Sequence, residues 1–261
     1  RGAQGIGSAR LSHGSPVRAS CRVLVCLLVA PAFPLLGQNA IDPPASTRVY
    51  PVNPETAPRP TARATRTNQP VVVDARLDEP DWLRAEVMTD FVQQLPRTGH
   101  AALFRTAVRV LYDPDYLYIG AMNYDAEPRK AITTGLQRDF DSGNSDVFGL
   151  TLDTFHDRRN SFLFLVNPKG AVRDEQTFND SRTIVDAWEG IIDMRTAVVD
   201  SGWVVEMRIP TRTLRFNATE QSQSWGLNIL RRVRRTNESS YWSPLDRQYR
   251  VHRMSQAGTL A

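Results

Sequence analysis

The stretch that decides the fold spans residues 145–170 and reads SDVFGLTLDTFHDRRNSFLFLVNPKG. Two runs rich in β-branched and aromatic residues, 147–153 and 161–167, flank a polar connection. Such runs favour strands, and a short polar connection between two of them favours a hairpin. Pro168 and Gly170 end the second run, because proline cannot donate to a strand ladder and glycine favours a turn. The stretch therefore predicts antiparallel β structure.

The same pattern recurs on both sides of this stretch. Strand-like runs at 107–112 and 116–122 surround an Asp-Pro-Asp turn signal, and runs at 191–199 and 203–209 surround Asp-Ser-Gly. Along 203–209 polar residues alternate with apolar ones, as expected for a strand with one buried face. The predicted fold class is all-β, an antiparallel and jelly-roll-like β-sandwich.

Three further segments complete the predicted domain. Residues 71–73 are valines and are expected to open it as a strand. Residues 74–82 read as a turn followed by a helical turn that carries Trp82 onto the core. Residues 225–235 are expected to form a long late strand that contains four arginines. Because successive strand side chains point to opposite faces, pairing of these arginines with acids is favoured over a nucleic-acid patch.

The N-terminal residues predict export. Arg18 and Arg22 precede the apolar run 23–30, which is the pattern of a secretory signal. This run is shorter than the roughly 20 residues that a membrane-spanning helix needs. We expect residues 1–40 to be a signal peptide or leader, and the protein to lie in the periplasm, at the outer membrane or outside the cell. A buried strand is the alternative interpretation of the run.

Residues 41–70 are expected to be a disordered linker, because seven prolines interrupt a stretch with little apolar surface. Residues 71–261 are expected to form the folded domain. They contain 24 basic and 26 acidic residues, so the basic balance of the chain comes from residues 1–70. This charge distribution argues against a nucleic-acid partner. Both cysteines, Cys21 and Cys26, lie in the leader, so no disulfide framework is expected in the domain.

Five motifs follow one another in a recognisable order. They are Asp74, Leu77, Asp78, Glu79 and Trp82; the hairpin 108–119; an Asp-rich loop that ends at Asp146; the strand 202–210; and the Trp-Gly-x-Asn sequence at 225–228. In this order they resemble family 9 carbohydrate-binding modules over about residues 71–261. The phrases at 153–159 and 241–244 are similar to a subgroup in which the sandwich precedes an outer-membrane-type barrel of unknown function.

The resemblance implies a non-catalytic β-sandwich that binds glycans or sugar ends, sometimes with calcium, and is usually attached to glycoside hydrolases. The sequence departs from the sugar-binding members at four places. The loop 142–145 has no aromatic residue, Gly149 stands where those members have a glutamate, Leu165 replaces an arginine, and Leu230 replaces an amide. A different ligand or a different pocket therefore stays open.

Candidate sugar-binding residues are aromatic rings that can stack on a pyranose and planar polar groups that can fix its hydroxyls. The candidates are Trp242, Tyr249, Trp188 and Arg247. Tyr249 lies among charged and polar residues, which indicates a surface loop. For Trp242 an exposed platform and a core position are both open, whereas Trp82, Trp203 and Trp225 are expected in the core.

A calcium site is conceivable in the Asp-rich loop. Asp139, Asp141, Asn144 and Asp146 space their oxygen donors at positions one, three, six and eight, and hard cations take such donors. The EF-hand pattern is not met, and a solvated acidic loop is the alternative. Catalytic residues are not expected, because the domain has no Gly-x-Ser-x-Gly elbow, no cysteine and only widely spaced histidines.

Three functions follow as hypotheses. The first is a carbohydrate-binding module of a secreted or outer-membrane protein that acts in carbohydrate catabolism alongside O-glycosyl hydrolases. The second is a structural or periplasmic module of an outer-membrane barrel protein, without sugar binding. The third is a haem-binding sandwich, with Met122 and either His156 or His252 as the candidate iron ligands.

Overall fold

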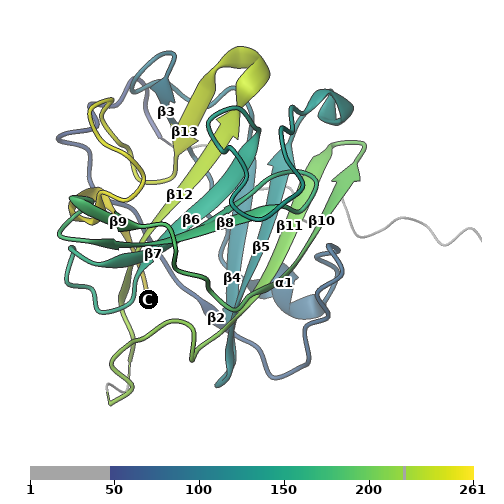
Figure 1. Ribbon diagram of the computed structural model, residues 1–261, viewed down its shortest axis with the longest axis vertical. Helices are drawn as coiled ribbons and strands as arrows, with labels where there is room; N and C mark the ends of the chain where they lie inside the picture. Colours follow the sequence, from purple (N-terminus) through teal and green to yellow (C-terminus); the bar gives the residue numbers. More distant parts are fainter. Residues whose placement is uncertain (1–47, 220–221) are drawn as a thin grey trace, which may run out of the picture. The chain divides into compact units, whose positions relative to one another are not determined.

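The computed structural model describes residues 48–219 and 222–261, so the expected leader lies outside the described residues. Two β-sheets face each other in this part of the chain (Figure 1). The fold is therefore all-β and sandwich-like, as the sequence predicted. Among the described residues, no helix is long and apolar enough to cross a membrane.

The nine-stranded sheet has the order β1-β14-β12-β6-β7-β8-β9, and β13 joins β12 to β3. Its strands are β1 (Thr61–Ala62), β3 (Val92–Leu95), β6 (Val147–Asp153), β7 (Ser161–Val166), β8 (Val172–Phe178), β9 (Thr183–Val185), β12 (Trp225–Val233), β13 (Glu238–Tyr241) and β14 (Gly258–Leu260).

The five-stranded sheet has the order β10-β11-β5-β4-β2. Its strands are β2 (Thr65–Arg66), β4 (Thr106–Tyr112), β5 (Tyr116–Tyr124), β10 (Asp193–Val199) and β11 (Gly202–Pro210). The helical elements in the described chain are short: α1 (Pro80–Arg84) and the 3₁₀ turns η2 (Pro128–Lys130), η3 (Arg234–Thr236) and η4 (Met254–Gln256).

All three predicted hairpins are confirmed as antiparallel pairs: β6 with β7, β4 with β5, and β10 with β11. The prediction of a strand at residues 71–73 is wrong, because Val71 instead packs outside the sheet against the cluster around Trp82. The long late strand ends at Val233, where η3 begins.

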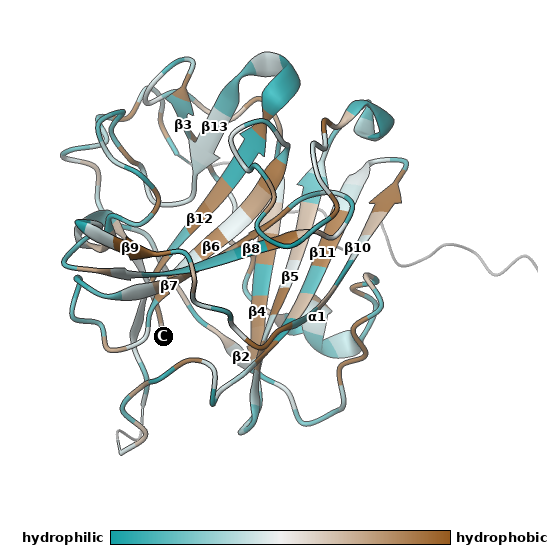
Figure 2. Cartoon of the chain, in the orientation of Figure 1, coloured by the Kyte–Doolittle hydropathy of each residue, from teal (hydrophilic) through white to brown (hydrophobic). Residues whose placement is uncertain are grey.

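The main core lies between the two sheets and follows from strand alternation. On β11, Trp203, Val205, Met207 and Ile209 point into it, and β6, β7 and β12 contribute alternate apolar residues from the other sheet. Figure 2 shows apolar segments along these central strands and polar residues in most of the connecting loops. The same two-residue period places a second set of side chains on the outer face of each sheet.

The outer face of the five-stranded sheet is covered by residues 71–85, including α1. Trp82 is fully buried there, as predicted, and packs over Gly120 of β5. A Cβ atom at Gly120 would lie 2.9 Å from Trp82 Cζ3 and 2.8 Å from Leu77 Cδ2. Glu206 of β11 fastens the same segment, because its Oε2 accepts hydrogen bonds from the backbone N–H groups of Asp74 and Ala75, both at 2.9 Å.

The described part of the expected linker takes part in the sandwich. β1 pairs in parallel with β14, and β2 pairs in parallel with β4, so each sheet gains an edge strand from this segment. The Arg59 guanidinium also donates to the Pro244 carbonyl at 2.7 Å. These contacts anchor residues 59–66 to both sheets.

Candidate functional site

Trp242 is placed in the core between the sheets. Its side chain is 4% exposed, and its backbone N–H donates to the Ile229 carbonyl at 3.1 Å. The ring lies so close to Gly258 that a Cβ atom there would come within 2.7 Å of Trp242 Cζ3. Of the two interpretations left open by the sequence, the structure shows the core position, and this ring offers no exposed stacking face.

Tyr249 and Arg247 lie in the loop after β13 and are already engaged with the protein. The Arg253 guanidinium carbon is 4.8 Å from the centre of the Tyr249 ring and covers one of its faces. Arg247 Nε donates to Thr98 Oγ1 at 2.6 Å, and its guanidinium also bonds the Pro96 carbonyl. Arg247 therefore ties this loop to the segment after β3.

Trp188 lies in a different environment. It is partly buried and packs against the main core, with ring centres 5.1 Å from Phe162 and 5.8 Å from Phe164. Tyr249 instead joins a cluster on the outer face of the nine-stranded sheet. Since Trp188 and Trp242 belong to the inner core and Tyr249 to the outer cluster, the structure does not bring the four predicted residues into one site.

The three strand positions at which the sequence departs from the sugar-binding members, 149, 165 and 230, lie in one row across the outer face of the nine-stranded sheet, and Tyr241 extends this row. Leu165 of β7 is paired with Gly149 of β6, which is paired with Leu230 of β12, which is paired with Tyr241 of β13. This row is apolar and buried, and Leu245 and Val251 of the loop after β13 pack on the same cluster. We call these four residues the outer row.

The four predicted calcium ligands do not converge. Asp141 accepts hydrogen bonds from Gly143 N at 2.9 Å and from Asn144 Nδ2 at 2.6 Å, and both Asp141 and Asn144 are exposed. Asp146 is fully buried, and its Oδ1 accepts from the Arg234 backbone N–H at 2.8 Å. Within residues 48–219 and 222–261 no group of three or more His, Cys, Asp or Glu side chains is arranged to hold a metal ion. The arrangement of these four residues does not fit a shared calcium ion.

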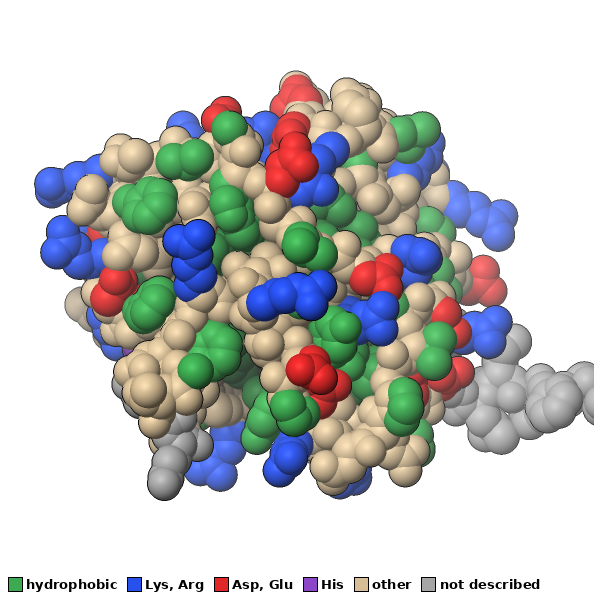
Figure 3. Space-filling view, turned by 60° about the horizontal axis from the view of Figure 1, so that its bottom comes forward, with side chains coloured by type: hydrophobic (Ala, Val, Ile, Leu, Met, Phe, Trp, Pro, Cys, Tyr) green, Lys and Arg blue, Asp and Glu red, His purple; other side chains and the backbone are tan. Residues whose placement is uncertain are grey.

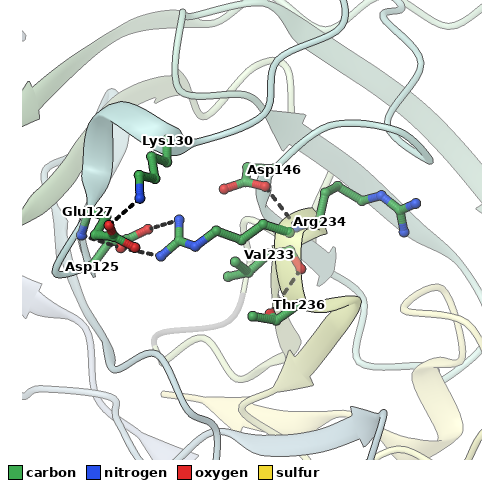
Figure 4. Close-up of polar contacts among 8 residues, drawn as sticks. Asp125, Glu127, Lys130, Asp146, Val233, Arg234 and Thr236 are labelled. Carbon is green, nitrogen blue, oxygen red and sulfur yellow. Dashed lines mark hydrogen bonds and ion pairs between the residues drawn. The ribbon is translucent and has the colours of Figure 1, made fainter.

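Asp146 belongs instead to a buried charged cluster at one end of the sandwich (Figure 4). Arg231 of β12 is fully buried, and its guanidinium lies 4.9 Å from the ring centre of Trp203. Arg235 forms an ion pair with Asp125 that includes a 2.7 Å hydrogen bond from Nη1. Burial lowers the pKa of Arg231 to about 10, although Asp146 and Asp125 favour its charged form. Arg235 therefore pairs with an acid, as the sequence favoured. Arg231 lies near Asp146 and Asp125 without a hydrogen bond to either of them, and Arg232 donates to the Ser142 carbonyl at 2.7 Å.

The candidate iron ligands are also separated. Met122 of β5 packs in the cluster under α1, on the outer face of the five-stranded sheet. His252 lies in the loop after β13, where its Nε2 is 2.8 Å from Glu175 Oε2 of β8 in the other sheet. His156, in the β6–β7 connection, contacts Ser224 at 3.3 Å. Met122 thus cannot share one iron with His252.

A cavity of about 560 Å³ opens at the end of the sandwich opposite the charged cluster, and we call it the end pocket. Figure 3 looks onto this end, where hydrophobic side chains lie in the surface between charged ones. Both sheets and three connections line the cavity with Arg63, Ala64, Tyr112, Asp113, Pro114, Tyr116, Leu117, Thr211, Phe216, Ser222, Gln223, Trp225, Leu260 and Ala261.

Four aromatic rings of the end pocket differ in exposure and support. Tyr112, the last residue of β4, is 41% exposed, whereas Trp225, the first residue of β12, is 7% exposed. Trp225 is held by Phe216, with ring centres 5.6 Å apart, and by Gln223 Oε1, which accepts from its Nε1 at 3.1 Å. Arg208 lies 5.1 Å from the centre of the Tyr116 ring.

Sequence reasoning missed this pocket. It placed Trp225 in the core, where it does pack, without detecting that the same residue lines a cavity. The available signal was the pair of tyrosines on either side of the Asp-Pro-Asp turn, at 112 and 116, because a strand end carries its aromatic residues to the rim of a sandwich.

Comparisons with known proteins agree with the fold. A carbohydrate-binding module of family 9 from Caldicellulosiruptor kristjanssonii, solved with cellotriose and with glucose, superposes with a TM-score of 0.55 at 14% identity. The match covers 77% of this chain and 92% of the cellotriose-bound chain, or 94% of the glucose-bound one. A candidate carbohydrate-binding protein from Bacteroides uniformis gives a TM-score of 0.61 at 12% identity, covering 78% of this chain and 99% of that one.

The comparison with curated proteins found no match. The family model described as "carbohydrate family 9 binding domain-like" matches residues 73–239, which include most strands of both sheets. The chain therefore belongs to the carbohydrate family 9 binding domain-like family.

Proposed function

We propose that this protein is a non-catalytic carbohydrate-binding module. The observation that carries the proposal is the family match over residues 73–239, which runs through both sheets of the sandwich. The solved neighbours from Caldicellulosiruptor kristjanssonii hold cellotriose and glucose, so these two sugars are the first ligands to test here. The exposed aromatic ring at the end pocket supports the same class of ligand, because ring faces stack on the apolar side of a pyranose.

The wider role follows from the same proposal. A binding module raises the local concentration of an attached partner on its substrate, as any tethered second site does. We propose that the module serves carbohydrate catabolism alongside O-glycosyl hydrolases, in an exported protein of the periplasm, the outer membrane or the cell exterior. An outer-membrane barrel on a longer chain would be the partner that it holds close to a glycan.

A structural module without sugar binding is the second candidate. The observation that favours it is the outer row, where leucines and a glycine replace the polar residues of the sugar-binding members. Titration calorimetry with cellotriose and glucose, followed by a glycan array, separates the two candidates. Saturable binding of a sugar supports the carbohydrate-binding module. A chain that unfolds cooperatively yet binds no glycan on the array overturns it and supports the structural module.

A further inference from the structure

We propose that the sugar site of this chain is the end pocket, and that it holds the terminal pyranose residue of a neutral glycan. This inference rests on the proposed function and names the site at which it acts. The resemblance implies polar sugar contacts at positions 149, 165 and 230 of the outer row, which lies on the outer face of the nine-stranded sheet. The end pocket lies between the β4–β5 turn end of the five-stranded sheet and the start of β12 in the nine-stranded sheet.

The outer row has no room for a sugar. Leu165 and Leu230 are almost fully buried, and the Leu165 side chain occupies the space above Gly149. The loop after β13 lies on this surface through Leu245 and Val251, and Arg247 ties that loop to the segment after β3. A sugar could reach the row only if this loop left its apolar contacts.

The end pocket has the dimensions and lining of a small-ligand site. Its volume of about 560 Å³ lies within the roughly 300–1,000 Å³ usual for such sites. Tyr112 presents an exposed ring at the rim, and Trp225 lies deeper. Because Phe216 and Gln223 fix the Trp225 indole, little side-chain entropy is lost when a ligand packs against it.

The charges of the lining favour a neutral ligand. Arg63 and Asp113 are the charged side chains among the lining residues, so their formal charges cancel. Asp113 is occupied by its own hairpin, because its carboxylate accepts from the backbone N–H groups of Asp115 and Tyr116 and from the Tyr118 hydroxyl, all at 2.7–2.8 Å. Arg63, Thr211 and Ser222 are among the lining side chains whose donors can meet sugar hydroxyls.

The end pocket is also concave and bounded by two sheets, which suits a chain end better than the middle of a polysaccharide. A flat aromatic platform would bind along a chain, whereas a concave cavity lined from both sheets admits one end of it. The expected ligand therefore enters with its terminal ring between Tyr112 and Trp225, and the rest of the glycan points to solvent.

The test uses cellotriose as the probe and compares three variants of the full chain. Tyr112→Ala removes the exposed ring of the pocket, Phe178→Ala removes an aromatic residue of similar exposure (37%) at the end of β8, and Arg247→Ala removes a charge from the loop over the outer row. We expect Tyr112→Ala to weaken cellotriose binding about tenfold, the loss expected when an aromatic stacking partner is removed. The two other variants should bind as the parent does.

The outcomes distinguish the site from the function. If the parent binds cellotriose and Arg247→Ala loses binding while Tyr112→Ala keeps it, the site is on the outer face and the inference is overturned, although the proposed function stands. If the parent binds neither cellotriose nor any glycan on an array, the proposed function fails and the inference fails with it. Arg63→Gln provides a second variant of the end pocket, because Arg63 is exposed and lines the cavity. It should also weaken cellotriose binding.

Discussion

Leu165 lies directly opposite Gly149 across the β6–β7 pair, and its side chain fills the space where a side chain at position 149 would begin. The glycine thus allows the leucine to lie flat on the sheet, where Leu165 joins the buried apolar cluster on the outer face. This relationship makes the outer row part of a hydrophobic cluster.

Leu230→Ala should therefore change stability and leave binding unchanged. Leu230 is 2% exposed, so the substitution should lower the free energy of unfolding by about 2–4 kcal/mol, as for other buried leucines. Urea denaturation measures this loss, and calorimetry should give the parent affinity for cellotriose. Leu136→Ala, at a residue that is 70% exposed, is the matched control and should unfold as the parent does. Parent-like stability of Leu230→Ala would show that the outer row is open.

Trp242→Ala should act in the same way as a core truncation. The ring belongs to the core between the sheets, so its loss should reduce the free energy of unfolding by about 3–5 kcal/mol. Thermal unfolding in parallel with Tyr112→Ala provides the comparison, because an exposed ring costs much less to remove. A Trp242→Ala variant of parent stability that had lost sugar binding would contradict the core position.

Arg231→Ala should destabilise the charged end of the sandwich. The change removes the packing of Arg231 on Trp203 and the positive charge that favours the ionised form of the buried Asp146, which should lower the free energy of unfolding by about 1–3 kcal/mol. Burial already raises the pKa of Asp146. Without Arg231 the pKa of Asp146 should rise further, so the loss of free energy of unfolding measured by urea denaturation should be smaller at pH 5 than at pH 8.

Arg195→Ala, at an exposed pair with Asp193, is the control, and it should lower the free energy of unfolding by less than about 1 kcal/mol. An equal deficit for both variants would contradict the buried interaction.

Glu206 should make the domain less stable as the pH rises. Burial raises the pKa of Glu206 from 4.5 to about 7, although the two backbone donors at Asp74 and Ala75 oppose the rise. The folded state therefore binds more protons than the unfolded state between these values. The stabilisation from the protonated group is complete below pH 4.5 and is lost as the pH passes 7, on the order of 3 kcal/mol.

Glu206→Gln isolates this contribution, because an amide oxygen can keep both backbone hydrogen bonds while the side chain stays neutral. Urea denaturation at pH 5 and pH 8 should show a smaller decrease for the variant than for the parent. The residual slope should come partly from Glu238, whose pKa burial also raises to about 7. Identical pH profiles for parent and variant would show that Glu206 does not titrate in this range.

The hairpins could be predicted from the sequence because their signals are local. The alternation of polar and apolar residues within β11 indicates which side chains face the core. The turn residues before β5 indicate that β4 and β5 pair as a hairpin. Residues 71–73 have the same strand propensity but find no neighbouring strand, and they cover the sheet instead. Strand propensity alone thus does not supply a hydrogen-bonding partner.

The end pocket could not be predicted because it forms from parts of the chain that are far apart. Arg63, Tyr112, Phe216, Trp225 and Leu260 come from separate segments, and no spacing along the sequence marks them. Asp146 shows how a local signal can mislead. The acidic loop before β6 suggested a cation site, but strand alternation turns the Asp146 carboxylate inward, to the same side as Phe148.

The most direct test of the end pocket is the indole N–H region of a ¹⁵N-labelled chain, recorded by NMR during titration with cellotriose. Trp225 lines the pocket, whereas Trp203 lies beside Asn123 at the other end of β11. Along β11, Trp203 lies seven residues from Pro210, which pairs with Tyr116 of the end pocket. This separation is roughly 23 Å at 3.3 Å per residue. The account predicts that the Trp225 signal moves with added cellotriose while the Trp203 and Trp188 signals stay in place. A stationary Trp225 signal with a Trp188 signal that moves to saturation would contradict it.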